Sequence, residues 1–361
     1  MGTMRTPSER HSLQPGGAEP VRRLRPWGER DGHALPSTST DLIIGSAPSC
    51  ELRIDRPGVS RHHAQLTNAS GSWIAIDLAS KNGVYVDGLR VGATTLVSGT
   101  ELRIGPARLL VEGARFAALH DFIGRLIGWA DPVAVDDLLR SVRGALRRRT
   151  VLYVSGEDDL VLFANSLHRR AVGNDRPFVV CDPRRRVLDE SVRSAASRPG
   201  GVEGYRAAAG GTLCVLAQRM PSDIESVLSL HARSDAPAAL LIVVGEVERN
   251  RLTTDIASNP PIRVPSIASR AADLSAIIDE YAREAAWELG VPDMSADDRA
   301  WVRQHSIASF TDIEKAARRI VAIRGSRSLT RAAERLDMAT VSLRRWLDRR
   351  ASPSSVERRF L

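Results

Sequence analysis

Two short stretches carry most of the side chains that could do chemistry. The first reads GVSRHHAQL (residues 58–66), and the second reads DLASKNGVYVDG (residues 77–88). Between them they supply hydroxyls, cations, two adjacent histidines and an amide. Such a set could bind a metal, hydrolyse a substrate or hold an anion.

Local spacing disfavours the first two alternatives. His62 and His63 are neighbours, and neighbouring residues of a strand point to opposite faces, so they are poorly placed to ligate one metal together. Ser60 lies in no G-x-S-x-G elbow or similar setting that would supply a base for nucleophilic catalysis. An anion pocket is therefore the favoured interpretation.

The donors in the two stretches suit a phosphate. Ser60 and Arg61 belong to one stretch, and Ser80 and Lys81 to the other; a hydroxyl and a cation from each can hold a phosphate dianion. Lys81 is one of only two lysines in a chain with 51 basic residues. Asn82 can bond a peptide backbone, so we predict a pocket for a phosphorylated peptide on loops between strands.

The sequence around these two stretches predicts an all-β domain. From about residue 21 to 112, short apolar runs recur about every ten residues and are separated by Gly, Pro, Asn and Asp, which is typical of a β-sandwich. Within this frame Gly45, Ser60-x-x-His63 and Ser80-Lys81-Asn82-Gly83 resemble a forkhead-associated (FHA) domain, a β-sandwich that binds phosphothreonine peptides.

The resemblance implies a role for each residue of the motif. Phosphate would be contacted by Ser60, Arg61 and Ser80, with charge from Lys81, and Asn82 would hold the peptide main chain. Gly45, His63 and Gly83 would be structural, with the His63 ring bracing the Ser60 loop from inside.

Ser46 is the departure from the family pattern. Gly45-Ser46 stands where the family usually has Gly-Arg, and that arginine is a principal phosphate ligand. Loss of one charge-assisted hydrogen bond, about 1.5–3 kcal/mol, would weaken binding by one or two orders of magnitude. Both a phosphothreonine reader and a phosphate-independent interaction domain therefore remain open.

The middle of the chain predicts an α/β domain. Continuous apolar runs at 151–155, 178–181, 211–217 and 239–245 alternate with helical stretches, which indicates a parallel sheet covered on both faces. Together with the predicted helices that follow, this region makes residues 121–324 resemble the AAA+ ATPase domain of bacterial sigma-54 activators. Segments such as RPFVVCDP and IRVPSIASRAADLSAII carry the resemblance.

The parts of that family that act on ATP are missing. The P-loop position reads Gly156-Glu157-Asp158-Asp159 without a lysine, and Leu216-Ala217 replaces the Asp-Glu pair that would bind Mg²⁺. Thr311 stands at the place of the lid arginine, and no GAFTGA-like text occurs. We therefore expect no enzymatic activity, cofactor, metal or action on sigma-54, and a core that serves as a spacer or oligomerisation body.

The last region predicts a helix-turn-helix. Residues 315–359 contain thirteen Lys or Arg and four Asp or Glu. Two short helices would pack through Leu329, Ala332, Ala333, Leu336, Met338, Leu343 and Leu347, with Asp337 in the turn. The segment resembles the Fis-type helix-turn-helix, which implies DNA contacts by Thr340, Val341, Ser342, Arg344 and Arg345.

The composition limits the kinds of partner and the cellular compartment that we expect for this protein. The formal charge of +8 favours a polyanionic or phosphorylated partner. Three scattered cysteines imply neither a disulfide framework nor a zinc site, which fits a reducing cytoplasm. The N-terminus lacks the apolar core of a signal peptide, and the longest apolar run, 236–245, is too short to cross a bilayer, so no membrane association is expected.

These patterns combine into a multidomain prediction. We expect a disordered N-terminus (1–18), an FHA sandwich (19–114), an AAA+-like α/β domain (121–262), a helical lid (263–324) and a helix-turn-helix (325–361). The predicted function is a non-enzymatic cytoplasmic bacterial transcription regulator. Its partners would be DNA and a phosphothreonine protein, either a Ser/Thr kinase or its substrate, and it could form a homo-oligomer. The alternative is a phosphopeptide-dependent scaffold without sequence-specific DNA binding.

Overall fold

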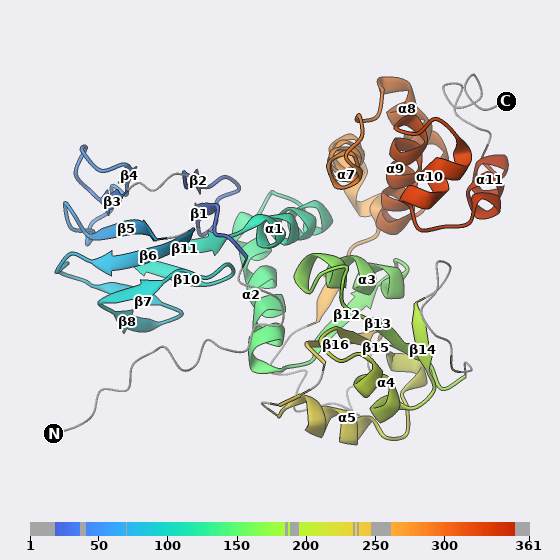
Figure 1. The fold of residues 1–361 in the computed structure, drawn as a ribbon, viewed down its shortest axis with the longest axis horizontal. Coiled ribbons are helices and arrows are strands. Elements are labelled where there is room, and N and C mark those ends of the chain that lie inside the picture. Colours follow the sequence, from blue (N-terminus) through green and yellow to red (C-terminus); the bar gives the residue numbers. More distant parts are fainter. Residues whose placement is uncertain are drawn as a thin grey trace. The chain divides into compact units, whose positions relative to one another are not determined.

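The chain folds into two compact units (Figure 1). The computed structural model describes residues 19–36, 41–69, 71–184, 187, 195–233, 235–236, 238–246 and 261–350. The first unit comprises residues up to 124 together with 129–143, and the second comprises 125–128 together with 144 onward. The predicted disordered N-terminus, 1–18, and the end of the predicted helix-turn-helix, 351–361, lie outside the described residues.

The first unit contains two β-sheets. One sheet has the order β2 (His33–Ala34), β1 (Arg23–Pro26), β11 (Ala107–Glu112), β10 (Glu101–Ile104), β7 (Val84–Val86), β8 (Leu89–Val91). The other has the order β4 (Leu52–Arg53), β3 (Leu42–Gly45), β5 (Ala64–Ala69), β6 (Ser72–Asp77), β9 (Ala93–Thr95). The predicted β-sandwich is therefore confirmed.

Alternating side chains build the core between the two sheets. Val84 and Val86 of β7 are buried, while Tyr85 between them is only partly buried. Strand β6 buries Trp73 and Ala75 in the same apolar cluster. Because side chains of a strand alternate between its faces, each strand needs apolar residues only at every second position. This alternation is the pattern that made the strands recognisable in the sequence.

A buried ion network joins the sandwich to a helix of the same unit. Helices α1 (Ala114–Ile127) and α2 (Pro132–Arg148) follow the last strand. Arg25 of β1 pairs with Glu112 at 2.8 Å and with Asp136 of α2 at 2.6 Å, and all three side chains are fully buried. The backbone N–H of Gly28 also donates to Asp136, at 2.7 Å. Each buried charge thus has a partner, which offsets the desolvation that burial imposes.

The second unit contains a six-stranded parallel sheet. Its order is β14 (Ala196–Arg198), β13 (Phe178–Cys181), β15 (Thr212–Leu216), β16 (Leu240–Val244), β12 (Leu152–Gly156), β17 (Ile262–Val264). Figure 1 places α3 (Leu160–Ala171) on one side of the sheet, and α4 (Gly201–Ala207) and α5 (Ile224–His231) on the other. The four apolar runs of the sequence form the four central strands, as expected. The three-residue strands β14 and β17 lie at the edges and were not predicted.

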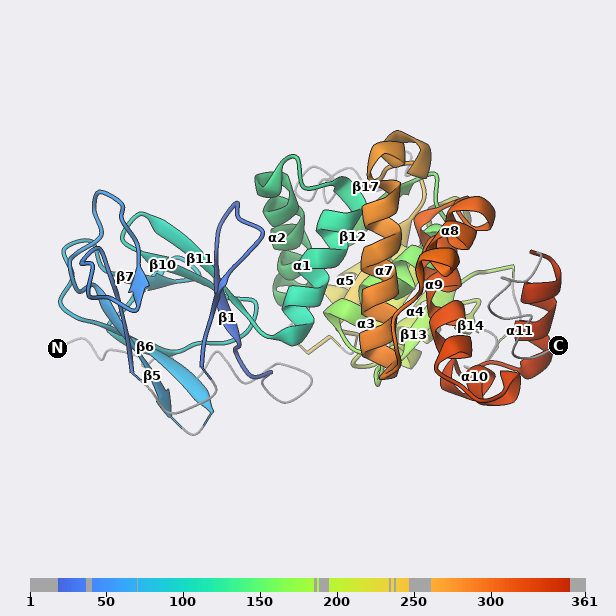
Figure 2. The same cartoon turned by 90° about the horizontal axis from the view of Figure 1, so that it is seen from above.

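A helical region completes this unit. It contains the short 3₁₀ helix Ile267–Asp273 and the helices α7 (Leu274–Leu289), α8 (Ala296–His305), α9 (Phe310–Arg324), α10 (Leu329–Arg335) and α11 (Thr340–Asp348); another 3₁₀ turn, Ala217–Arg219, follows β15. Helices α7 and α9 pack side by side (Figure 2). Among the helices described, none combines the length and apolar character needed to cross a bilayer.

Charged side chains tie this helical region to α3. Arg170 of α3 pairs with Glu284 of α7 at 2.6 Å, and Ser166 of α3 donates to Glu314 of α9 at 2.7 Å. Arg169 also pairs with Glu314. Burial opposes ionisation of Glu314, but Arg170 and Arg169 outweigh it and lower the pKa of this carboxyl to about 2. Glu314 is therefore charged at neutral pH, and its two arginines hold α9 against α3.

Two buried histidines predict that the second unit loses stability in mild acid. Burial lowers the pKa of both His168 and His231 from 6.5 to about 4. The unfolded chain therefore binds more protons than the folded one between pH 6.5 and 4, so the unfolding free energy falls as the pH falls through that window. Urea unfolding of the full chain at pH 7, 5.5 and 4.5 measures this effect.

Single substitutions test whether the buried histidines cause this pH dependence of the unfolding free energy. His168→Gln should remove part of the pH dependence and leave the part due to His231, whereas His62→Gln, which changes an exposed histidine of the first unit, should leave it unchanged. A stability of the second unit that does not change between pH 7 and 4.5 would contradict the assignment.

Candidate functional site

The predicted phosphopeptide loops meet around the His63 ring. His63 is fully buried at the start of β5. Its Nδ1 accepts a hydrogen bond from the backbone N–H of Ser60 at 3.0 Å, and its Nε2 donates to the carbonyl of Gly83 at 3.1 Å. This pairing fixes one tautomer and joins the loop before β5 to the loop before β7. Both ring nitrogens are committed to backbone, so His63 cannot serve Ser60 as a general base.

Two glycines allow the close approach of these loops. A Cβ on Gly45 would lie 2.1 Å from the carbonyl oxygen of Arg61, so a side chain there would push the loops apart. Gly83 has φ +74°, the left-handed region that other residues rarely adopt. The backbone N–H of Ser46 then donates to the carbonyl of Ser60 at 3.0 Å. The loop after β3 is thereby fastened to the Ser60 loop.

The structure places a hydroxyl and two cations at the surface of these loops. Ser60 is half-buried, and its Oγ accepts from the backbone N–H of Lys81 at 3.2 Å. Arg61 and Lys81 are exposed, and within the described residues neither side chain forms an ion pair. Ser60, Arg61 and Lys81 therefore come together as donors for an anion.

Three other predicted residues are used within the fold. Ser80 is buried, and its Oγ accepts from the backbone N–H of Gly83 at 3.0 Å, so it shapes the turn that carries Lys81 and Asn82; its contact with phosphate stays a prediction. Asn82 is exposed, and its Nδ2 donates to the carbonyl of Gly58 at 2.8 Å, which orients the amide beside the loops. Ser46 is half-buried, and its Oγ donates to the carbonyl of Val59 at 3.2 Å. Because serine is uncharged, this position supplies no positive charge to the site.

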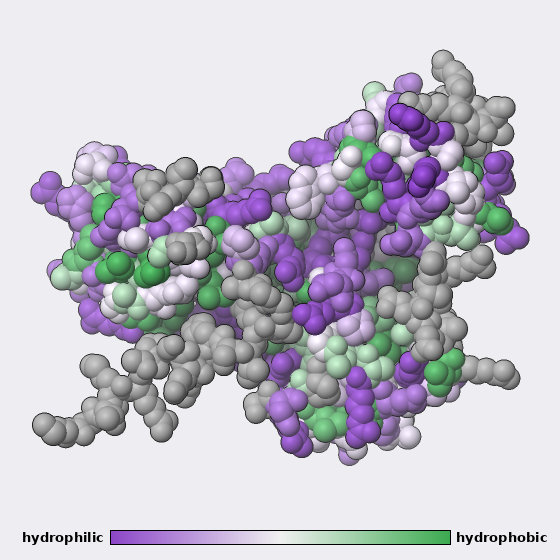
Figure 3. All heavy atoms as spheres, viewed as in Figure 1, coloured by the Kyte–Doolittle hydropathy of each residue, from purple (hydrophilic) through white to green (hydrophobic). Residues whose placement is uncertain are grey.

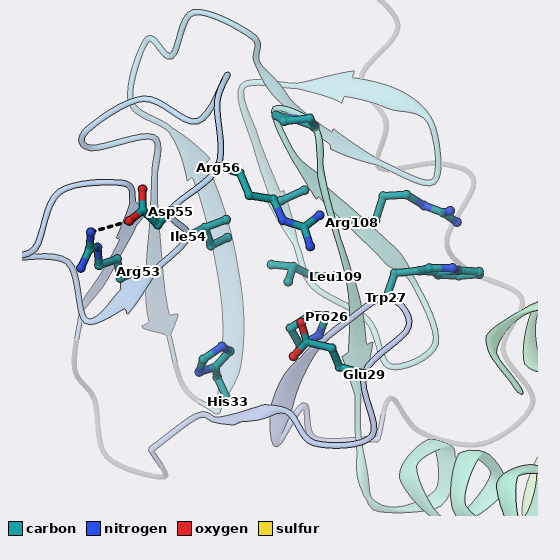
Figure 4. A pocket seen from close by; sticks show the side chains of 12 residues that line it. Pro26, Trp27, Glu29, His33, Arg53, Ile54, Asp55, Arg56, Arg108 and Leu109 are labelled. Atoms are coloured by element: carbon teal, nitrogen blue, oxygen red, sulfur yellow. Dashed lines mark hydrogen bonds and ion pairs between the residues drawn. The ribbon is translucent and has the colours of Figure 1, made fainter. Parts of the chain in front are cut away.

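A groove of about 280 Å³ opens elsewhere on the same unit (Figure 4). Ile54 and Leu109 contribute apolar surface, and Figure 4 shows Arg56 extending toward Leu109. Arg56 lies four residues before Ser60, and no motif in the sequence singled it out. Across the described residues, no group of three or more His, Cys, Asp or Glu side chains could hold a metal ion.

The loop between β12 and α3 carries two carboxylates that are already hydrogen-bonded within the unit. Asp159 caps α3 by accepting from the backbone N–H of Leu162 at 3.2 Å. Asp158 accepts from the Thr311 hydroxyl at 2.7 Å, at the start of α9. Phosphates bind at helix N-termini because the backbone N–H groups and the helix dipole favour negative charge. Here Asp159 fills that role at α3, and Asp158 also accepts from the backbone N–H of Thr311 at 3.4 Å in the first turn of α9, whose N-cap is Ser309.

The predicted DNA-binding residues lie on one exposed side of α11. Leu343 and Leu347 are buried, while Arg344 and Arg345 are exposed and Val341 is 58% exposed. Thr340 and Ser342 are half-buried. On the face drawn in Figure 3, hydrophilic side chains are spread over the helical region α7–α11, with a few hydrophobic ones among them.

The turn between α10 and α11 has the geometry expected for Asp337. This residue adopts φ +49°, which Asp tolerates better than most side chains. Leu329, Ala332 and Ala333 of α10 are buried as expected, whereas Leu336 and Met338 are only partly buried.

An aromatic contact that the sequence did not predict anchors α11. Trp346 is buried and meets Trp301 of α8 edge to face, with 5.6 Å between the ring centroids. The guanidinium of Arg319 lies 4.9 Å from the Trp346 ring centroid. These contacts fix α11 to the preceding helices, and only the helical spacing of Trp346 from Leu343 could have indicated burial.

Comparison with known proteins identifies one domain. Residues 42–105 match the family model described as the FHA domain. The prediction of this domain is confirmed, and FHA domains bind phosphothreonine peptides of partner proteins. The matched segment contains the residues of the three loops that meet around His63, from Ser46 to Gly83.

Three curated proteins are similar to part of the chain. An oxoglutarate dehydrogenase inhibitor of Corynebacterium diphtheriae is 38% identical over 72 residues, covering 20% of this chain and 50% of that protein. The glycogen accumulation regulator GarA of Mycolicibacterium smegmatis is 35% identical over 75 residues, covering 21% and 45%. The transcriptional regulatory protein EmbR of Mycobacterium tuberculosis is 33% identical over 89 residues, covering 24% and 22%. The chain thus spans half or less of each of these relatives.

Solved structures show the same partial likeness. The structure of Mycobacterium tuberculosis EmbR in complex with a low affinity phosphopeptide is 29% identical, covers 26% of this chain and 24% of that one, and has a TM-score of 0.24. A structure from a study of phosphothreonine-dependent FHA interactions is 26% identical, covers 26% and 95%, and has a TM-score of 0.24.

Ser46→Arg should strengthen phosphate binding. The substitution restores a cation where the family usually has one, and one charge-assisted hydrogen bond of about 1.5–3 kcal/mol corresponds to about 10- to 150-fold in affinity. Calorimetric titration with matched phosphothreonine and threonine peptides, on wild type and variant, measures the change.

Ser46→Gln serves as the uncharged control, because it adds length without charge. The expected gain is confined to the phosphothreonine peptide. An equal gain for both peptides, or none for either, would contradict the placement of the phosphate beside residue 46.

Proposed function

We propose that this protein is a DNA-binding transcription regulator whose FHA domain receives a phosphothreonine signal. The observation that carries the proposal is the two-sided character of α11. Its inner side is buried through Leu343, Trp346 and Leu347, while Arg344 and Arg345 extend from the other side without ion pairs among the described residues. An exposed helix with unpaired arginines suits contact with base edges and phosphates.

The proposed binding of a phosphothreonine protein rests on the FHA loops. Ser60, Arg61 and Lys81 together offer a hydroxyl and two charges, which suits a phosphate dianion held beside a peptide. The partner is a protein that carries phosphothreonine, either a Ser/Thr kinase or its substrate. The similarity to the regulators named above supports a signalling role. Binding of this partner alters how the helix-turn-helix occupies DNA.

The middle of the chain acts in this proposal as an AAA+-like body without nucleotide chemistry and without action on sigma-54. Asp158 and Asp159 would repel a triphosphate at the loop where a P-loop would hold it, and both carboxylates already bind helix N-termini. The body supports the helix-turn-helix and can provide an oligomerisation surface. Cys50, Cys181 and Cys214 are free and buried, which suits a reducing cytoplasm.

Arg344→Ala and Arg345→Ala should weaken binding to the preferred DNA sequence. Loss of a base contact costs about 1–3 kcal/mol, and loss of a phosphate contact lowers the slope of log affinity against log salt by about one. The preferred sequence is first selected from a random duplex library with the full chain. Fluorescence anisotropy across a salt series then compares this duplex with a scrambled one.

Arg283→Ala is the control for the loss of one positive charge, because Arg283 is exposed on α7, outside the helix-turn-helix. It should retain the preference for the selected duplex. Selection that enriches no sequence, or equal loss on selected and scrambled duplexes, would support a scaffold with a merely basic tail and would contradict the proposal.

The full chain should neither bind nor hydrolyse ATP. It lacks a P-loop lysine, and its loop carboxylates are engaged with helix N-termini. Phosphate release and a fluorescent-nucleotide titration with Mg²⁺ measure this directly. Hydrolysis by the wild type that Asp158→Asn abolishes would contradict the proposal.

A further inference from the structure

A row of side chains crosses the outer face of the first sheet. Arg90 of β8 lies directly opposite Tyr85 of β7, and Tyr85 lies directly opposite Arg103 of β10. Residues paired in this way share one face of an antiparallel sheet. Val84 and Val86, the neighbours of Tyr85, point into the core, so Arg90, Tyr85 and Arg103 face away from it. We call these three residues the Arg90–Tyr85–Arg103 row.

Both guanidinium groups of the row turn toward the peptide-binding loops. Arg103 lies 3.6 Å from the centroid of the Tyr85 ring and donates to the carbonyl of Gly105 at 3.2 Å. Arg90 packs against Gly83, since a Cβ on that glycine would lie 2.7 Å from Arg90 Nε. Gly105 in turn donates its backbone N–H to the carbonyl of Gly83 at 3.1 Å. The two arginines therefore adjoin the turn that presents Lys81 and Asn82.

The charge of the row is not neutralised. Arg108 of β11, opposite Arg103, forms two hydrogen bonds with Glu101, at 2.8 and 2.9 Å, and stacks on Trp27 (Figure 4). Within the part of the chain that the structure describes, Arg90 and Arg103 have no such carboxylate. Tyr85 orients Arg103 by stacking, which reduces the side-chain entropy that an ion pair would otherwise lose.

A bound peptide would come within reach of this charge. Each residue of an extended chain spans about 3.3–3.6 Å, and Arg90 packs on the residue that follows Asn82. Side chains one to three residues from the phosphothreonine would therefore pass the row. We propose that Arg90 and Arg103 bind acidic side chains that flank the phosphothreonine, so that the domain selects acidic phosphopeptides. This inference rests on the proposed phosphothreonine binding.

The row would also compensate in part for the phosphate affinity that is lost because residue 46 is serine and not arginine. The phosphate loses one ligand there, whereas contacts with flanking carboxylates add binding free energy at a different place on the same peptide. Exposed ion pairs contribute about two- to fivefold each in affinity, so two of them recover part of that loss.

The test uses the full chain and three synthetic peptides. One carries phosphothreonine with Asp and Glu on both sides, the second carries phosphothreonine with Ala and Ser there, and the third carries threonine with the acidic flanks. The ratio of affinities for the first and third tests the proposed function, and the ratio for the first and second tests this inference. Calorimetry at two salt concentrations gives both ratios.

Variants that remove one charge test whether the Arg90–Tyr85–Arg103 row causes the preference for the acidic over the neutral phosphopeptide. Wild type should prefer the acidic phosphopeptide by about four- to twenty-fivefold over the neutral one, and Arg90→Gln and Arg103→Gln should each reduce that preference by about two- to fivefold. Both should leave the affinity for the neutral phosphopeptide unchanged. Arg22→Gln, at an exposed arginine beside the opposite end of the sheet, should change neither ratio.

Three results would overturn the inference. The first is a wild type that binds phosphothreonine without preference for acidic flanks. The second is a preference that survives both substitutions. The third is a loss of duplex DNA affinity in Arg90→Gln with the peptide ratios intact, which would assign the row to nucleic acid. A wild type that does not distinguish phosphothreonine from threonine would instead remove the proposed function.

Discussion

The His63 ring is the interaction on which the candidate site depends. It accepts from Ser60 and donates to Gly83, two backbone groups more than twenty residues apart, and it lies wholly inside the protein. A buried donor or acceptor that loses its partner costs about 1–3 kcal/mol, so replacement of this ring would release both loops. The geometry of the candidate site is therefore set by a fully buried side chain, while Arg61 and Lys81 place positive charge at its surface.

The same division between buried structure and exposed charge recurs in the second unit. Glu314 and Arg170 are buried between α3 and α9 and hold the helical region in place. Asp158 adds a bond from the loop after β12 to Thr311. This contact joins the two segments within the unit, while Arg344 and Arg345 of α11 remain exposed.

Much of the fold could be predicted from the sequence, because its strongest signals are periodic. Alternation around Tyr85 predicted a sandwich strand, the continuous run in β16 predicted a buried parallel strand, and Asp337 marked a turn. The edge strands β14 and β17 escaped notice, since three residues provide too little pattern. The bond between Ser80 and Gly83 was not predicted for a different reason: a serine in a turn can face a ligand or bond its own backbone, and local sequence does not distinguish the two.

The site was predictable where a motif fixes both residue type and spacing, and not where contacts cross strands. Arg90 lies next to Gly83 because Asp87 and Gly88 form a two-residue hairpin turn with positive φ at both positions, which sets the register of β8. Trp346 meets Trp301 across a distance in sequence that no local pattern spans. Such long-range contacts depend on how the elements pack, and for that reason the anchor of α11 became visible only in the structure.

The central claim is that a phosphothreonine signal controls DNA occupancy through one chain. The most direct measurement is the affinity of the full chain for its selected duplex, in the presence of a saturating acidic phosphothreonine peptide and of its unphosphorylated counterpart. The account predicts that the phosphorylated peptide changes the DNA affinity and that the unphosphorylated one does not. Identical DNA affinities with both peptides, under conditions where the phosphorylated peptide is bound, would contradict it.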